Sequence, residues 1–242
     1  MLSIFQKKTF LADLLPGFTD FHNHLLPGID DGANTVADSL AMISMFNELG
    51  INDFVASPHV MGEFYPNTPA TILPALEKLK EKLPEGNTIK AAGEYMMDQF
   101  LLEQLESPNL LKTTEKHLLV EMSFFQAPIN LEEILFKIQN QNLKPILAHP
   151  ERYAFYHSPS LKEYKDLKTR GCTFQLNMLS LTPHYGPGIQ KKAFQLLENN
   201  MIDYLSSDAH RTEHLEKIKN IKLTKKQLSL IEPVIERSKA LF

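Results

Sequence analysis

The sequence lacks most features of secreted, membrane-embedded and nucleic-acid-binding proteins. It contains one cysteine, Cys172, so no intramolecular disulfide can form, and we expect a reducing, cytoplasmic location. No apolar run approaches the roughly 20 residues of a transmembrane helix, so we expect no integral membrane protein. Lys7 and Lys8 interrupt the apolar N-terminal stretch, which therefore does not predict a signal peptide. The net charge of -4 argues against a nucleic-acid partner.

Signatures of three common enzyme mechanisms are also missing. Cysteine-dependent phosphatases use a C-x-x-x-x-x-R motif, but Met178 occupies the arginine position after Cys172. The chain contains neither the G-x-S-x-G motif of serine hydrolases nor the G-x-x-x-x-G-K phosphate loop. Catalysis by this chain therefore has to rely on other groups.

The hydrophobic pattern predicts one α/β domain. Of 242 residues, 43% are hydrophobic and 22% are charged, as in ordinary globular proteins. Short strand-like runs alternate with amphipathic helices, which implies a parallel sheet. We expect a closed barrel over residues 17–242, with an open doubly wound sheet as the alternative. Residues 1–16 are expected to form an N-terminal arm of unknown role. The expected strands are Phe18–His22, Asp53–Ser57, Thr88–Glu94, His117–Glu121, Pro145–His149, Thr173–Asn177 and Tyr204–Ser207.

Histidines and carboxylates end six of the seven expected strands. His22 and His24 follow the first strand two positions apart, so both imidazoles point to one face. The other residues of this kind are His59, Glu94, Glu121, His149, Asp208 and His210. Because the carboxyl ends of parallel barrel strands lie on one face, we expect these side chains to converge. Buried carboxylates need partners, and imidazole with carboxylate suits Mn, Fe or Zn.

Taken singly, each of these residues has an ordinary structural explanation. Glu121 alone can be an ion-paired strand end, His59 a turn residue and Asp208 a helix cap. Their coincidence at one predicted edge is what favours a metal site. The spacing does not choose between Asp30 and Asp31, because both lie in the loop after the first strand.

The motifs together resemble the PHP (polymerase and histidinol phosphatase) superfamily, and within it the bacterial capsule-associated protein-tyrosine phosphatases. The most specific segment is Asp20-Phe-His22-Asn-His24-Leu-Leu-Pro-Gly-Ile-Asp30-Asp31-Gly-Ala. It is followed in the family's order by Ser57-Pro58-His59, Gly93-Glu94, Val120-Glu121, Ala148-His149-Pro-Glu151-Arg152-Tyr153 and Ser207-Asp208-Ala-His210. The resemblance implies a distorted (β/α)7 TIM-like barrel of PHP type. It also implies up to three divalent ions at the C-terminal ends of the strands, with Mn preferred and Fe or Zn as alternatives.

The resemblance assigns roles residue by residue. It implies three metal groups, formed by His22, His24, Glu94 and Asp208, by Glu94, Glu121 and His149, and by Asp31, His59 and His210. Arg152 is the implied phosphate-binding residue, because a guanidinium forks onto phosphate oxygens. Asp31 can also help to deprotonate water, and Glu151 is a weaker candidate, either for an acid or for a residue that orients a metal ligand from outside. The family places a second arginine a few residues beyond the last histidine, whereas this chain has Arg211 directly after His210.

The implied function is a metal-dependent phosphotyrosine-protein phosphatase acting on a bacterial tyrosine kinase of polysaccharide export. A small-molecule phosphatase, for example for histidinol phosphate, is one alternative, and a non-catalytic metal-binding or scaffold protein is another. Several aromatic residues near the predicted rim form either a slot for a phosphotyrosine ring or ordinary packing, namely Phe64, Tyr65, Phe124, Phe125, Tyr153 and Tyr156. The sequence leaves the native metal, the oligomeric state and the physiological substrate open.

Overall fold

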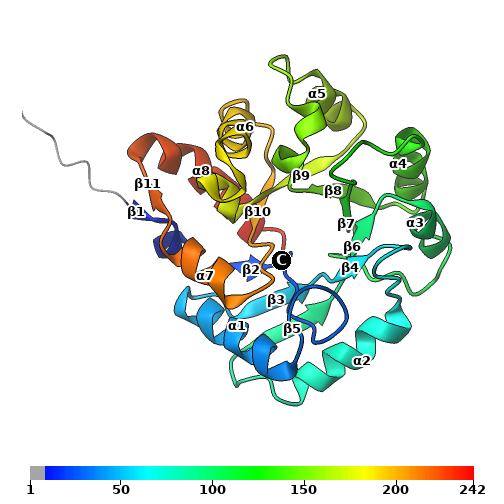
Figure 1. The fold of residues 1–242 in the computed structure, drawn as a ribbon, viewed down its shortest axis with the longest axis vertical. Helices are drawn as coiled ribbons and strands as arrows, with labels where there is room; N and C mark the ends of the chain where they lie inside the picture. The colour runs from blue at the N-terminus through cyan, green and yellow to red at the C-terminus, as the bar shows by residue number, and fades with distance from the viewer. Residues whose placement is uncertain (1–8) are drawn as a thin grey trace, which may run out of the picture.

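The computed structural model describes residues 9–242, in which parallel strands surround a central axis and helices cover them from outside (Figure 1). One sheet has six strands in the order β10 (Tyr204–Ser206), β9 (Thr173–Asn177), β8 (Lys144–Ala148), β7 (His117–Glu121), β6 (Glu94–Met96) and β4 (His59–Val60). A second sheet has three strands in the order β2 (Thr19–Asp20), β3 (Asp53–Ala56) and β5 (Thr88–Ala91). All neighbouring strands in these two sheets are parallel.

The two sheets meet where two chain segments pass from one to the other. Only Ser57 and Pro58 separate β3 from β4, and only residues 92–93 separate β5 from β6. Pro58 has no N–H to donate, while its carbonyl accepts a hydrogen bond from the backbone of Glu94 at 2.9 Å. On the opposite side a lone parallel bridge joins Asn23 to Ala209. The predicted α/β class and parallel strand order are confirmed, but the strands form two sheets instead of one closed sheet.

Eight α-helices are described, namely α1 (Val36–Glu48), α2 (Pro69–Lys80), α3 (Gln99–Gln104), α4 (Leu131–Asn140), α5 (Lys162–Thr169), α6 (Pro187–Glu198), α7 (Thr212–Lys219) and α8 (Lys225–Lys239). Thr35 is the N-cap of α1, since its hydroxyl accepts from Asp38 N while the Asp38 carboxylate accepts from Thr35 N. The short helices α3, α5 and α7 are not predicted from the sequence, because six to eight residues leave little periodicity to recognise.

The described residues pack against the rest of the fold from Thr9 onward. β1 (Thr9–Phe10) pairs antiparallel with β11 (Lys222–Leu223), and Leu11 and Leu15 are fully buried. Residues 1–8 lie outside the described residues, so the division of the chain at residue 16 stays a prediction. Within residues 9–242, none of the helices combines the length and the apolar character needed to cross a membrane.

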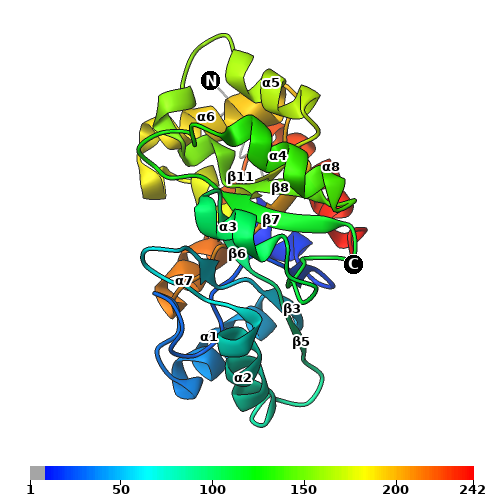
Figure 2. The same ribbon diagram turned by 90° about the vertical axis from the view of Figure 1, so that its right-hand side faces the viewer.

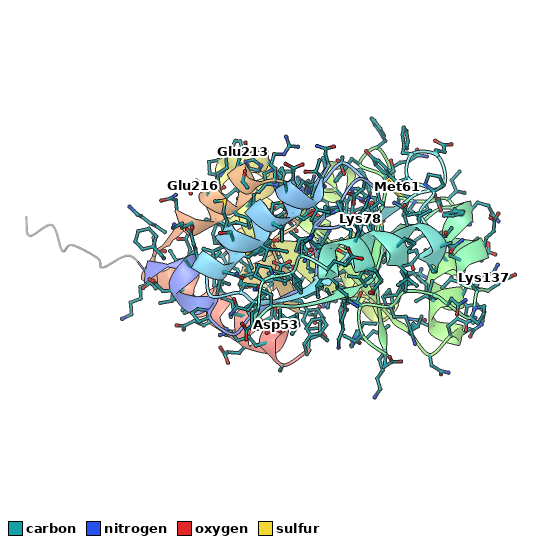
Figure 3. The ribbon with its side chains drawn as sticks, turned by 90° about the horizontal axis from the view of Figure 1, so that it is seen from below. Asp53, Met61, Lys78, Lys137, Glu213 and Glu216 are labelled. Carbon is teal, nitrogen blue, oxygen red and sulfur yellow. The ribbon has the colours of Figure 1, made fainter. Side chains whose placement is uncertain are left out.

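The loops that follow the strands lie on one side of the molecule. In the side view they project from the edge opposite the chain's C-terminus (Figure 2). Figure 3 shows Met61, which follows β4, on the same side as Glu213 of α7, whereas Asp53, the first residue of β3, lies toward the other side. Residues at strand ends therefore share one face, as the parallel arrangement requires.

The barrel interior holds a small apolar cluster below that face. It consists of Phe21, Val55, Ala92, Leu119, Ile146 and Ala148. The Phe21 ring lies 6.1 Å from the ring of Tyr204 and 5.7 Å from that of Phe242, measured between centroids. The C-terminal residue thus packs against the cluster that supports the neighbouring His22.

Replacing Phe21 by alanine should lower the free energy of unfolding by about 3–5 kcal/mol, because it leaves a cavity in a closely packed interior. The measurement is urea unfolding followed by circular dichroism. Phe136→Ala is the matched control, since that ring is 62% exposed on α4 and its removal should change stability by less than about 0.5 kcal/mol. Equal changes in the two variants would contradict the assignment of Phe21 to the core.

Candidate metal centre

All nine residues expected to bind metal come together at the strand ends. They form four overlapping groups, and within each group the candidate ligand atoms lie within 4.8 Å of one another. The groups are His24, Asp31, His59 and His210; His22, Glu94 and His149; His22, His24 and Asp208; and His59, Glu94 and Glu121. These groups overlap more than the three sets that the resemblance implies, since His24 also joins the first group and His59 the last.

Glu94 lies at the centre of the arrangement and is fully buried. Its Oε1 lies 3.1 Å from Nε2 of His22 and 3.0 Å from Nε2 of His149. Its Oε2 lies 3.0 Å from Nδ1 of His59 and 3.6 Å from Nε2 of His24. The two oxygens therefore face different groups, which is the geometry of a carboxylate that can bridge two ions.

The Asp31 group is the most accessible part of the site. Asp31 Oδ1 lies 3.4 Å from Nε2 of His59 and 3.4 Å from Nε2 of His210, and its side chain is 50% exposed. The ring of His210 stacks on that of His24 with centroids 3.7 Å apart. Partial burial acts to raise the pKa of Asp31, but the neighbouring imidazoles, His210 first, hold it well below its usual range.

Asp30 contacts two histidines of this group, His24 and His59, a role that the sequence did not reveal. Its Oδ2 lies 2.7 Å from Nδ1 of His24 and accepts a hydrogen bond from the backbone N–H of His59 at 3.1 Å. Burial alone would lower the pKa of His24, yet the Asp30 carboxylate reverses this and raises the pKa to about 10. Asp30 thus orients a candidate ligand while Asp31 belongs to the ligand group itself, as the resemblance implies.

Gly32 lets the loop that carries both aspartates cross His24. A Cβ at Gly32 would overlap the backbone carbonyl oxygen and the Cβ of His24. The same loop is held by hydrogen bonds from Ala33 N to His24 O at 3.1 Å and from Gly32 N to Asp30 Oδ1 at 3.0 Å. The position of Asp31 therefore depends on the missing side chain one residue later.

Two polar residues of β9 were also missed, on the one expected strand that ends without a histidine or carboxylate. Gln175 Oε1 lies 2.8 Å from Nδ1 of His22, which leaves Nε2 of that ring facing the cluster. Asn177 Nδ2 donates to Asp208 Oδ2 at 2.8 Å. Polar residues at alternate positions of a buried strand are the signal that could have found them, because such groups need partners.

His149 and Asp208 follow their strands with left-handed backbone angles. Their φ values are 35° and 51°, a region that side-chain-bearing residues rarely adopt. Each such residue costs about 1–3 kcal/mol and persists only where the surroundings impose it. The sharp turn after β8 and after β10 aims both side chains into the cluster.

Arg152 lies beside the cluster, in the short helix η2 (Pro150–Arg152) after β8. Its Nη1 donates to Asp208 Oδ2 at 2.7 Å, and its side chain is 19% exposed. The guanidinium lies 4.7 Å from the ring centre of Phe124 and 4.3 Å from that of Tyr185. A charged group held between two ring faces beside the site is well placed for an anion.

Arg211 and Glu151 occupy different surroundings. Arg211 is exposed and lines a hollow of about 410 Å³ together with Asp31 and His210. Glu151 is fully buried, and its Oε1 accepts hydrogen bonds from the Ser180 hydroxyl and from the backbone of Asn177. Burial raises the pKa of Glu151 to about 7, and none of the four groups found within residues 9–242 includes it.

The electrostatics of the cluster fit divalent cations. Burial and the nearby Glu94 carboxylate raise the pKa of Glu121 to about 7. Burial and then Arg152 lower the pKa of His149 to about 4, so this imidazole is neutral and can donate its lone pair to a metal. Closely packed imidazoles and carboxylates are the donor set of Mn, Fe and Zn sites.

Comparison with known proteins agrees with this geometry. A family model described as "Capsular polysaccharide synthesis, CpsB/CapC" matches residues 18–228, which include all nine residues of the cluster. The chain belongs to this family. Among curated CpsB/CapC relatives, tyrosine-protein phosphatase YwqE of Bacillus subtilis is 32% identical over 205 residues, covering 80% of this chain and 78% of YwqE. Tyrosine-protein phosphatase CpsB of Streptococcus agalactiae is 25% identical over 206 residues, covering 80% and 83%.

Solved structures agree with the CpsB/CapC assignment. A chain from the crystal structures of YwqE from Bacillus subtilis and CpsB from Streptococcus pneumoniae, described as metal-dependent tyrosine phosphatases, superposes with a TM-score of 0.71 and 29% identity, covering 81% of each chain. A histidinol phosphate phosphatase from Lactococcus lactis superposes with a TM-score of 0.53, 11% identity and coverage of 92% and 94%. This second likeness shows the barrel fold alone.

Gly32→Ala should displace the loop and weaken the Asp31 group, so that bound Mn²⁺ falls by about one ion per chain. The measurement is metal content after dialysis against Mn²⁺, determined by plasma emission spectroscopy. Gly188→Ala is the matched control, because no heavy atom lies within 4 Å of its added Cβ. Unchanged metal content in Gly32→Ala would show that the loop does not place a ligand.

Proposed function

We propose that this protein is a metal-dependent phosphotyrosine-protein phosphatase that hydrolyses phosphotyrosine with an activated water. The observation that carries the proposal is the convergence of nine imidazole and carboxylate side chains beside Arg152 at one end of the barrel. The names of the CpsB/CapC relatives support the choice of a tyrosine phosphatase. They favour it over a histidinol phosphatase, since the solved enzyme of that kind shares only the fold.

The cluster is proposed to hold up to three divalent ions, with Mn²⁺ preferred and Fe or Zn as alternatives. Following the family resemblance, we assign one ion to His22, His24, Glu94 and Asp208, a second to Glu94, Glu121 and His149, and a third to Asp31, His59 and His210. The third set lies within one of the observed groups, and each of the other two is divided between two of them. Such ions, when bound, supply positive charge to phosphate oxygens and lower the pKa of a water toward neutrality. Oε1 of Glu94 lies 3.1 Å from Nε2 of His22 and 3.0 Å from Nε2 of His149, which are assigned to different ions, and this supports the assignment of Glu94 to both.

The chain's own residues then act on the phosphate and the water. Arg152 donates two N–H groups to phosphate oxygens, and Asp208 and the two flanking rings hold its guanidinium in place beforehand. Asp31, the half-exposed carboxylate, accepts a proton from the attacking water. Arg211 is the candidate second phosphate contact because it shares a hollow with Asp31 and His210.

A tyrosyl ester is the substrate best suited to this site. A phenol has a pKa near 10, so a phenolate leaves more readily than a serine or threonine alkoxide and needs less help from an acid. Glu151 is turned toward Ser180 and Asn177, and we assign it no acid role. We propose a bacterial tyrosine kinase of polysaccharide export as the protein substrate and the cytoplasm as the location, both as implied by the family resemblance.

Metal-stripped protein should release phosphate from a phosphotyrosine peptide only after Mn²⁺ is added. The measurement is phosphate release with and without Mn²⁺, beside a phosphoserine peptide and histidinol phosphate at equal concentration. Release from the tyrosyl peptide alone is the expected result. Preference for histidinol phosphate would favour a small-molecule phosphatase. Absence of phosphate release from all three substrates would favour a non-catalytic metal-binding protein.

Arg152→Ala should lower kcat/KM by roughly 10²–10³-fold while leaving bound metal unchanged, because it removes charge stabilisation of the transition state. Arg152→Lys should recover only part of this, since lysine cannot donate two parallel hydrogen bonds. Arg211→Ala should lower kcat/KM by a smaller factor, because water screens an exposed guanidinium. Arg170→Ala, which removes an exposed side chain paired with Glu132, serves as the control and should be neutral. Full activity in Arg152→Ala would refute its assigned role.

A further inference from the structure

A large apolar hollow opens next to the metal cluster and has no part in the mechanism above. Its volume is about 730 Å³. The side chains that give it its apolar character are those of Met61, Phe64, Met96, Phe100, Phe125 and Pro128. We call it the Met61–Pro128 hollow. Its volume exceeds that of a single aromatic side chain, so it suits a short stretch of polypeptide.

The walls of this hollow continue directly from the candidate metal ligands. Met61 comes two residues after His59, and Met96 two residues after Glu94 in the same strand. In the pairing of β6 with β7, Met96 is the neighbour of Glu121. Two residues of a strand span about 7 Å, so the hollow begins within two or three residues' reach of the cluster.

Phe124 lies between the candidate metal centre and the Met61–Pro128 hollow. Its ring stacks on that of His149 at 5.6 Å and lies under the guanidinium of Arg152 at 4.7 Å. The next residue, Phe125, lines the hollow and is 92% exposed, and Phe64 on the facing loop is 75% exposed. Large aromatic side chains that gather on an exposed surface mark an interaction site. A substrate that reaches Arg152 therefore also meets this apolar surface.

The negative charge around the hollow restricts the peptide segments that can bind there. The acidic residues that line it are Glu63, Asp98 and Glu103, and none of the described lining residues is Lys or Arg. Asp98 is engaged, because its two carboxylate oxygens accept hydrogen bonds from Gly62 N and Leu101 N. Glu63 and Glu103 repel acidic segments and leave apolar or basic ones favoured.

We propose that the Met61–Pro128 hollow binds an apolar segment of the substrate polypeptide, two or three residues from the phosphotyrosine. The proposal rests on the phosphatase function proposed above and adds a preference that the metal cluster cannot supply. Burial of an apolar side chain there lowers the free energy of the enzyme–substrate complex without touching the reacting phosphate. The protein then selects phosphotyrosines by their apolar neighbours and disfavours those flanked by acidic residues.

The test compares two phosphotyrosine peptides of equal length. One carries Leu and Phe two and three residues from the phosphotyrosine on both sides, and the other carries Ser at those positions. The wild-type protein should show kcat/KM about tenfold higher on the apolar peptide, which corresponds to about 1.4 kcal/mol. The double variant Phe64→Ser, Phe125→Ser should lose this preference and hydrolyse phenyl phosphate at the wild-type rate. Phe136→Ser, which alters an exposed ring outside the hollow, should keep the preference.

A binding measurement separates this proposal from the proposed activity. Fluorescence anisotropy is recorded for both peptides with a non-hydrolysable phosphonate in place of the phosphate, using the protein as purified. Tighter binding of the apolar peptide, lost in the double variant, supports the hollow even if no phosphoester is hydrolysed, in which case only the proposed activity fails. Equal binding of the two peptides, or a preference that survives in the double variant, would overturn the hollow as a docking site while the activity on phenyl phosphate stands.

Discussion

The buried carboxylate of Glu94 is the interaction on which the site depends. It opens β6, where the chain passes from one sheet to the other, and its two oxygens face imidazoles that come from β4 and from the segments after β2 and β8. A carboxylate without access to water is costly in a protein interior unless cations or hydrogen-bond donors compensate. The surrounding histidines therefore converge on this one charge.

A second layer of residues surrounds the candidate metal ligands and fixes their orientation. Asp30 holds His24, Gln175 holds His22 and Asn177 holds Asp208, in each case through one ring nitrogen or one carboxylate oxygen. Such outer contacts fix which atom of a ligand faces the metal. Arg152 shares Asp208 with this layer, so the proposed phosphate contact and the metal cluster are positioned by the same carboxylate. The left-handed backbone at Asp208 is tolerated because these contacts act on it together.

Much of this could be predicted from the sequence, because strand ends in a parallel barrel converge. The sequence predicts the strands His117–Glu121 and Thr173–Asn177 with their observed bounds, and it indicates all nine residues of the four groups as candidate ligands. Three things were not accessible from residue spacing and hydrophobic pattern alone. The choice between Asp30 and Asp31 depends on how Gly32 lets the loop cross His24. The break of the sheet depends on the hydrogen bonds around Pro58. The apolar hollow depends on three segments meeting in space, namely residues 61–64, 96–103 and 123–128.

The central proposal is that Glu94 would be shared by two metal ions within one buried cluster. It is tested most directly by crystals grown with Mn²⁺ and measured on both sides of the manganese absorption edge. The account predicts two anomalous peaks within reach of the Glu94 carboxylate, one among His22, His24 and Asp208 and the other beside His149 and Glu121. A single peak touching one oxygen, or manganese bound only at the surface, would contradict it.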